Sequence, residues 1–156
     1  MVAIVTGSFD PITIGHLEII KKVAHQYEKL YVVALVNPEK DGMFNLEQRK
    51  ELIRLSVSDI PNVVADAYAG LTAEYMIQNG INIIIRGIRD ASDEEYENEL
   101  ADAMKKFNPN FDTIFIHCDD KFKDITSTIV RERIKNGQDL IGFVPEIIIN
   151  PLKKML

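Results

Sequence analysis

The stretch VTGSFDPITIGHLEII, residues 5–20, decides the fold because it changes from one type of secondary structure to another. Its first residues extend the apolar run VAIVT (2–6), which is typical of a strand buried on both faces. Its last residues open HLEIIKKVAHQY (16–27), in which apolar residues recur at helical spacing. A polar segment between Gly7 and Gly15 joins the two. The stretch therefore predicts a strand, a polar loop and a helix.

The same alternation continues along the chain. Five short apolar runs predict strands at 2–6, 30–36, 62–67, 81–86 and 112–117. Longer amphipathic runs predict helices at 16–27, 46–57, 71–80, 93–107 and 127–137, with a short last helix over 145–149. Strands that alternate with helices in this way predict βαβ units and a parallel sheet.

Helix starts and stops are marked by particular residues. Asn45 with Gln48, and Ser92 with Glu95, have the spacing of capping boxes. Pro151 is expected to break or kink the last helix. The helix over 93–107 is acidic, but it carries an apolar stripe formed by Tyr96, Leu100, Met104 and Phe107.

Composition narrows the class of protein. A chain of 156 residues is expected to form one domain, residues 1–156, and Cys118 as the only cysteine excludes an intramolecular disulfide and a Cys-rich zinc site. The start lacks a basic n-region, and no apolar run approaches the ~20 residues of a membrane helix, so we expect a cytoplasmic protein that does not bind membranes. The formal charge of −6 argues against a nucleic-acid partner.

Ligands of parallel sheets bind where the strands end, near the point at which the strand order reverses. Nearly every unusual residue of this chain falls in a segment that follows a predicted strand. These segments are 7–16, 37–44, 69–72, 86–93 and 117–128. The sequence therefore predicts that loops from separate strands converge on one site.

The first of these segments favours an anion. Gly7 lets the backbone turn close to a ligand, and Ser8 offers a hydroxyl. His16 lies in the first turn of a helix, where free amides attract anions and an imidazole can donate a hydrogen bond to a phosphoryl oxygen. The alternative is that Asp10 and Pro11 simply make a turn and His16 is exposed.

Arg86 is the last residue of the most hydrophobic predicted strand, and Arg89 comes three residues later. Two guanidinium groups there are costly unless an anion meets them, and a phosphate would serve. The alternative is internal pairing with acids that come shortly after. These acids are Asp90, Asp93 and Glu97.

The remaining segments carry weaker signals. Lys40 lies in a loop with Pro and Gly neighbours, where a lysine either reaches a phosphate or is solvated. Thr126, Ser127 and Thr128 precede a helix, where hydroxyls either cap the helix or bind outer phosphates of a nucleotide. No protein-held metal is expected, because the adjacent residues 117–120 do not have the spacing of a ligand set.

Four motifs taken together resemble the phosphopantetheine adenylyltransferase family of the nucleotidyltransferase superfamily. They are GSFDPITIGH (7–16), NPEK (37–40), IIRGIRD (84–90) with a later YE (96–97), and ITSTIVRE (125–132). The resemblance covers essentially the whole chain, and the T-x-G-H and R-G-x-R forms are specific to this branch. This sequence departs from the family where Thr6 replaces a common proline and Asp41 a second lysine.

The resemblance implies a Rossmann-like, doubly wound parallel five-stranded sheet with helices on both faces and a C-terminal helical extension. It implies transfer of AMP from ATP to 4′-phosphopantetheine, giving dephospho-CoA and pyrophosphate in coenzyme A biosynthesis, by direct in-line transfer without a covalent intermediate. Mg²⁺ would be carried by ATP and pyrophosphate. The family is typically a homohexamer, and coenzyme A can feed back on the site.

The resemblance also implies residue roles. His16, Lys40 and Arg89 would be catalytic, with His16 stabilising the transition state. Residues expected to contact ATP are Ser8, Phe9, His16, Gly87, Ile88, Arg89, Glu97, Phe122, Lys123, Asp124, Ile125, Thr126, Ser127 and Thr128. Residues expected to contact phosphopantetheine are Ser8, Lys40, Thr72 and Arg86.

Two other functions remain open on the sequence. One is a nucleotidyltransferase acting on nicotinate mononucleotide, glycerol phosphate or a related phosphate. The other is a nucleotide-binding regulatory module without catalysis.

Overall fold

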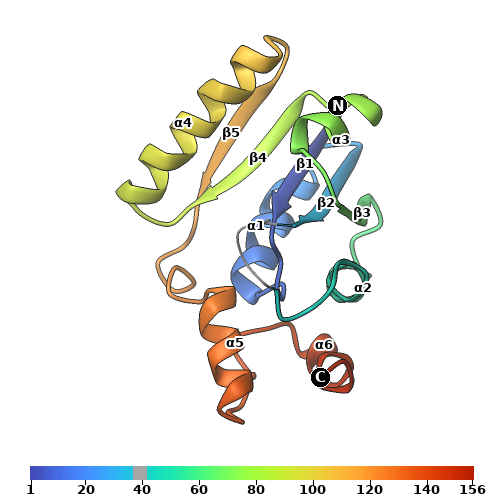
Figure 1. Ribbon diagram of the computed structural model, residues 1–156, viewed down its shortest axis with the longest axis vertical. Coiled ribbons are helices and arrows are strands. Elements are labelled where there is room, and N and C mark those ends of the chain that lie inside the picture. Colours follow the sequence, from blue (N-terminus) through green and yellow to red (C-terminus); the bar gives the residue numbers. More distant parts are fainter. Residues whose placement is uncertain (37–41) are drawn as a thin grey trace.

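The computed structural model describes residues 1–36 and 42–156. Strands and helices alternate along these residues, as Figure 1 shows. The strands are β1 (Val2–Gly7), β2 (Lys29–Leu35), β3 (Val63–Tyr68), β4 (Ile83–Ile88) and β5 (Asp112–His117). The helices are α1 (Ile14–Ala24), α2 (Leu46–Ser56), α3 (Thr72–Gln78), α4 (Ala91–Phe107), α5 (Ser127–Lys135) and α6 (Glu146–Lys154).

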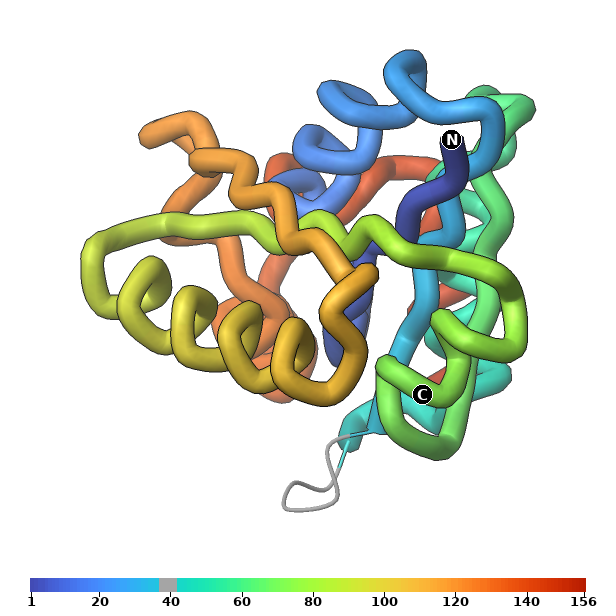
Figure 2. The backbone as a smooth tube through the Cα atoms, turned by 90° about the horizontal axis from the view of Figure 1, so that it is seen from above, coloured from blue at the N-terminus to red at the C-terminus, as the bar shows by residue number. Residues whose placement is uncertain are grey.

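The five strands form one parallel sheet in the order β3-β2-β1-β4-β5. The order reverses between β1 and β4, which makes this pair the topological switch point. Figure 2 shows α1 on one side of the sheet and α4 on the other. The predicted Rossmann-like α/β fold, with five parallel strands, helices on both faces and a C-terminal helix, is confirmed.

Side chains alternate between two cores, one on each face of the sheet. Ala3 and Val5 pack with residues of α1, α2, α5 and α6. Ile4 points the other way and packs with residues of α3. This period of two is what a strand dictates, and burying each such aliphatic side chain contributes about 1.5–3 kcal/mol.

The N-terminal cap of α2 is the one that the sequence predicted, whereas the cap of α4 is a different residue. Asn45 and Gln48 form the predicted capping box of α2. At α4 the cap is Asp90, whose side chain accepts from the N–H of Asp93, so the prediction that Ser92 caps this helix is wrong. Asp and Ser cap about equally well, and the helix extends to the earlier of the two.

The prediction that the last helix runs only to Ile149 is also wrong, because α6 continues through Pro151 to Lys154 and the proline does not break it. Ile148 and Leu152 are both fully buried in the core on either side of the proline. Burial of these two side chains offsets the backbone hydrogen bond that proline cannot make.

The apolar stripe of α4 lies at the surface. Tyr96 and Phe107 are each 60% exposed, and Leu100 is 39% exposed. The one buried residue of α4 is Glu97. Figure 1 shows α4 alongside β4 and β5, at the edge of the sheet. Among the described residues, no helix is both long enough and apolar enough to span a bilayer.

Candidate active site

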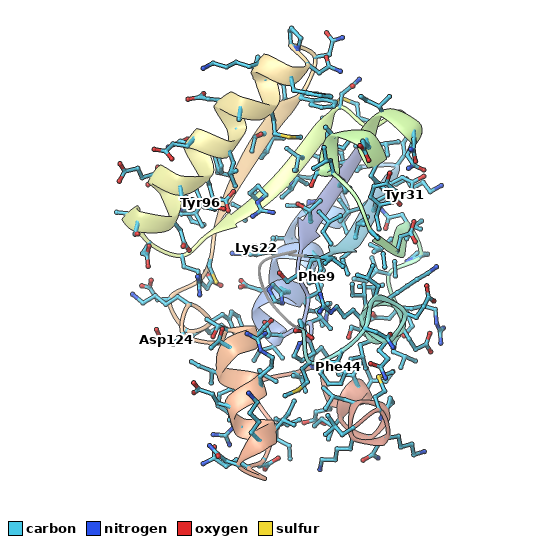
Figure 3. The ribbon with its side chains drawn as sticks, viewed as in Figure 1. Phe9, Lys22, Tyr31, Phe44, Tyr96 and Asp124 are labelled. Carbon is cyan, nitrogen blue, oxygen red and sulfur yellow. The ribbon has the colours of Figure 1, made fainter. Side chains whose placement is uncertain are left out.

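A cavity of about 1080 Å³ lies at the carboxyl ends of the strands. Its walls come from β1, β4 and their following segments, from α1, α2 and α4, and from the start of α5. In Figure 3, Phe9 lies between Tyr96 of α4 and Phe44, which precedes α2, and all three line the cavity. Four of the five segments predicted to converge do so, and segment 69–72 does not contribute to the lining.

His16 is held by the capping box that starts α1. The backbone N–H of Thr13 donates to Nδ1 of His16 at 3.0 Å, and the Thr13 hydroxyl accepts from the N–H of His16. α1 therefore begins at Ile14, earlier than predicted. Because Nδ1 accepts a hydrogen bond, the neutral ring carries its proton on Nε2.

The imidazole is kept neutral by its surroundings. Burial, and to a smaller extent the positive charge of Arg89, lower the pKa of His16 to about 4. The ring also lies edge-on to Phe9, with 4.9 Å between the ring centroids. At neutral pH His16 is therefore an uncharged hydrogen-bond donor in the cavity wall.

Phe9 adopts a backbone conformation that side chains rarely take, with φ at 44°. Its side chain is nevertheless buried, and a Cβ on Gly7 would lie 3.4 Å from its ring. Such conformations persist where surrounding structure enforces them, and they concentrate at functional sites. The tight turn after β1 thus presses Phe9 against His16.

Arg86 makes four hydrogen bonds within the chain. Its Nε and Nη2 donate to the two carboxylate oxygens of Glu97, both at 2.8 Å. Its Nη1 donates to the hydroxyl of Thr6 at 2.8 Å and to the Thr6 carbonyl at 3.1 Å. A guanidinium has five N–H donors, so one on Nη2 is left over.

Arg89 is paired as well, since its Nε lies 3.0 Å from a carboxylate oxygen of Asp93. The internal pairing that the sequence left open as an alternative is therefore present for both arginines. It does not exclude a ligand, because both arginines and both acids line the cavity.

Asp10 connects three parts of the site. Its carboxylate is buried and accepts from the N–H groups of Met43 and Phe44, both at 2.9 Å. Arg49 of α2 lies 3.4 Å from it, and Arg131 of α5 donates to the Asp10 carbonyl at 2.8 Å. The sequence marked Asp10 only as a turn residue and did not single out Arg49, because polar residues are common on a surface helix.

The hydroxyls at the start of α5 are engaged by the protein. Thr126 caps the helix by accepting an N–H, as the simpler of the two interpretations proposed. Ser127 donates to the carbonyl of Pro11 at 2.7 Å, and Thr128 accepts from Arg131 at 3.1 Å. These contacts tie α5 to the first loop while all three residues line the cavity.

The structure brings together most of the residues that the sequence selected. Those lining the cavity are Ser8, Phe9, His16, Arg86, Gly87, Arg89, Glu97, Phe122, Ile125, Thr126, Ser127 and Thr128. Those outside its lining are Thr72, Ile88, Lys123 and Asp124. Lys40 lies outside the described residues. Within those residues, no group of three His, Cys, Asp or Glu side chains is placed to hold a metal ion.

In parallel α/β sheets, ligands bind in a crevice at the switch point, and the cavity of this chain lies there. Residues 4–133 match the family described as cytidylyltransferase-like. The chain belongs to this family, whose activity is nucleotidyl transfer from a nucleoside triphosphate. The match begins within β1 and runs through β5 and most of α5.

Proposed function

We propose that this protein is a pantetheine-phosphate adenylyltransferase, which transfers AMP from ATP to 4′-phosphopantetheine in coenzyme A biosynthesis. One observation carries the proposal: His16, Arg86, Arg89 and the turn 126–128 line a single cavity. Its volume of about 1080 Å³ suits two substrates rather than one. The whole chain, residues 1–156, acts in this proposal as one nucleotidyltransferase domain.

The chemistry needs positioning more than activation. A phosphate oxygen of the acceptor attacks the α-phosphorus of ATP, the bond to the bridging oxygen of the β-phosphate breaks, and pyrophosphate leaves with the electron pair. The second pKa of a phosphate monoester is about 6, so the acceptor is mostly a dianion at neutral pH and needs no general base. In-line transfer without a covalent intermediate follows, because the acceptor itself is the nucleophile.

His16 is suited to the α-phosphate. Its Nε2–H is an uncharged donor fixed by Thr13 and Phe9, so it costs little reorganisation as charge develops in the transition state. In this proposal Ser8 and Phe9 contact the nucleotide beside it. The free amides at the start of α5 donate hydrogen bonds to the β- and γ-phosphates near Ser127 and Thr128.

In this proposal the two arginines bind different substrates. Arg86 would bind the acceptor phosphate with its remaining Nη2–H, and Arg89 would support the ATP phosphates together with Gly87, Ile88 and Glu97. Mg²⁺ enters as part of the ATP substrate, held by its phosphate oxygens. Lys40 as an acceptor ligand and Thr72 beside the pantetheine arm stay predictions.

We also propose a homohexamer, with coenzyme A as a product-side feedback ligand. The exposed apolar stripe of α4 supports association, because Tyr96, Leu100 and Phe107 together present large side chains to solvent.

The test is an acceptor screen. Purified protein is incubated with Mg–ATP and, separately, 4′-phosphopantetheine, nicotinate mononucleotide and glycerol phosphate, and pyrophosphate release is measured. We expect release with 4′-phosphopantetheine and formation of dephospho-CoA. Release only with another acceptor would replace this substrate assignment, and ATP binding without turnover on any acceptor would favour a regulatory module.

A further inference from the structure

Thr6 is a polar residue at the end of an otherwise apolar strand. It is 8% exposed, and it lines the cavity. β1 pairs with β4 at Ala3, Ile4 and Val5, and the described pairing stops there. Thr6 is thus the first residue beyond the β1–β4 pairing, where the crevice of the switch point opens.

The hydroxyl of Thr6 accepts a hydrogen bond but donates none to a described residue. Its oxygen accepts from Nη1 of Arg86 at 2.8 Å, and the Thr6 carbonyl accepts from the same nitrogen at 3.1 Å. A threonine hydroxyl can also donate, yet no described residue accepts its proton. Because Thr6 lines the cavity, this proton is available to an acceptor oxygen of a ligand bound there.

Thr6 and Arg86 lie on the same side of the sheet. Ile4, two residues earlier, packs in the core that α3 contributes to, so Thr6 shares that face. Arg86 reaches the same place and is joined there to Glu97 of α4. The His16 side of the cavity belongs to α1, which covers the opposite face of the sheet.

We propose that Thr6 is a binding residue for the phosphate of the acceptor. Its hydroxyl accepts from Arg86 and donates its own proton to a phosphate oxygen, next to the remaining Nη2–H of Arg86. Glu97 balances the charge of Arg86, so the phosphate is recognised mainly by two fixed hydrogen-bond donors. This inference rests on the proposed function, because it takes the ligand to be a phosphate-bearing acceptor.

The first experiment measures binding by calorimetry. 4′-Phosphopantetheine, pantetheine and ATP are titrated into the wild-type protein, Thr6→Val and Thr6→Ser. Thr113→Val is the matched control, because Thr113 is a partly buried strand threonine outside the cavity. We expect Thr6→Val to weaken 4′-phosphopantetheine about tenfold or more, the range for a hydrogen bond to a charged group. Thr6→Ser should bind it nearly normally, and ATP and pantetheine should be unaffected throughout.

A second measurement separates donation from support of Arg86. In a crystal structure of Thr6→Val, Arg86 should keep its place, because Glu97 and the Thr6-position carbonyl still hold it. Weaker binding with Arg86 in place supports the inference, whereas a displaced Arg86 would show that Thr6 acts only by positioning the arginine. Should Thr6→Val fold poorly, Thr6→Ala also removes the hydroxyl and serves the same comparison.

Two further outcomes would overturn the inference. One is unchanged affinity for 4′-phosphopantetheine in Thr6→Val, and the other is equal weakening for pantetheine, which lacks the phosphate. If the acceptor screen selects a different phosphate monoester, the substrate assignment fails, and the same titration with that monoester and its dephosphorylated form decides the role of Thr6 independently.

Discussion

Both carboxylate oxygens of Glu97 accept hydrogen bonds from Arg86, each 2.8 Å long, and this pair joins α4 to β4. The carboxylate is buried, while the guanidinium remains in contact with the cavity. The pair therefore has two roles, because it fastens a surface helix to the sheet and fixes the orientation of an arginine in the site.

Replacing Glu97 should lower the stability of the protein. Glu97→Ala leaves the Arg86 charge unpaired in a partly buried place, and losing one partner of such a pair costs about 2–4 kcal/mol. Urea unfolding measures the effect, with Glu95→Ala as the matched control on the exposed face of α4. Equal stabilities of the two variants would contradict a structural role for the Arg86–Glu97 pair.

Replacing His16 should slow catalysis while leaving nucleotide binding intact. His16→Ala removes the Nε2–H donor, and the loss of one transition-state donor typically lowers turnover by ~100-fold or more. Pyrophosphate release measures turnover, and calorimetry measures ATP affinity. His25→Ala is the control, because His25 is an exposed residue at the end of α1. Normal turnover in His16→Ala would remove this residue from the mechanism.

The lowered pKa of His16 predicts how stability depends on pH. The folded-state pKa is about 4, below the ordinary value of 6.5, so between these values the unfolded chain binds a proton that the folded protein excludes. The stability of the wild-type protein should therefore fall relative to His16→Asn as pH decreases from 7 to 4. Urea unfolding at several pH values checks this, and a difference that stays constant with pH would contradict it.

Replacing Arg86 should affect the acceptor more than ATP. Arg86→Ala removes the guanidinium that we assign to the acceptor phosphate, so the KM for 4′-phosphopantetheine should rise about tenfold or more while the KM for ATP changes little. Arg54→Ala is a suitable control, because Arg54 pairs with Glu51 on an exposed part of α2. An unchanged acceptor KM would show that Arg86 serves the fold alone.

Much of the fold could be predicted from local pattern. The five apolar runs correspond to the five strands within two residues at their ends, because buried parallel strands leave a strong signal in the sequence. The capping box at Asn45 was equally plain, since it depends on residues three apart. The path of α6 through Pro151 could not be predicted, because it depends on burial of Ile148 and Leu152 by distant helices.

The sequence predicted which residues line the cavity better than it predicted the hydrogen bonds and ion pairs between them. Strand ends of a parallel sheet meet at one edge, so the convergence of His16, Arg86 and the turn 126–128 followed from position alone. The hydrogen-bond partners of these groups could not be predicted from position. Whether Glu97 faces Arg86 depends on how α4 lies against β4, and the links from Asp10 to Arg49 and Arg131 join segments far apart in sequence.

The pairing of the cavity arginines with carboxylates is expected to make ligand binding less sensitive to salt concentration. Arg49, Arg86 and Arg89 each already have a carboxylate neighbour, so these three described arginines present little unbalanced positive charge to an arriving polyanion. Capture at long range by an open electric field is correspondingly weak, and recognition depends on short contacts that require the right shape. If the proposed function holds, we expect such a cavity to select among phosphorylated metabolites by shape more than a purely cationic groove would.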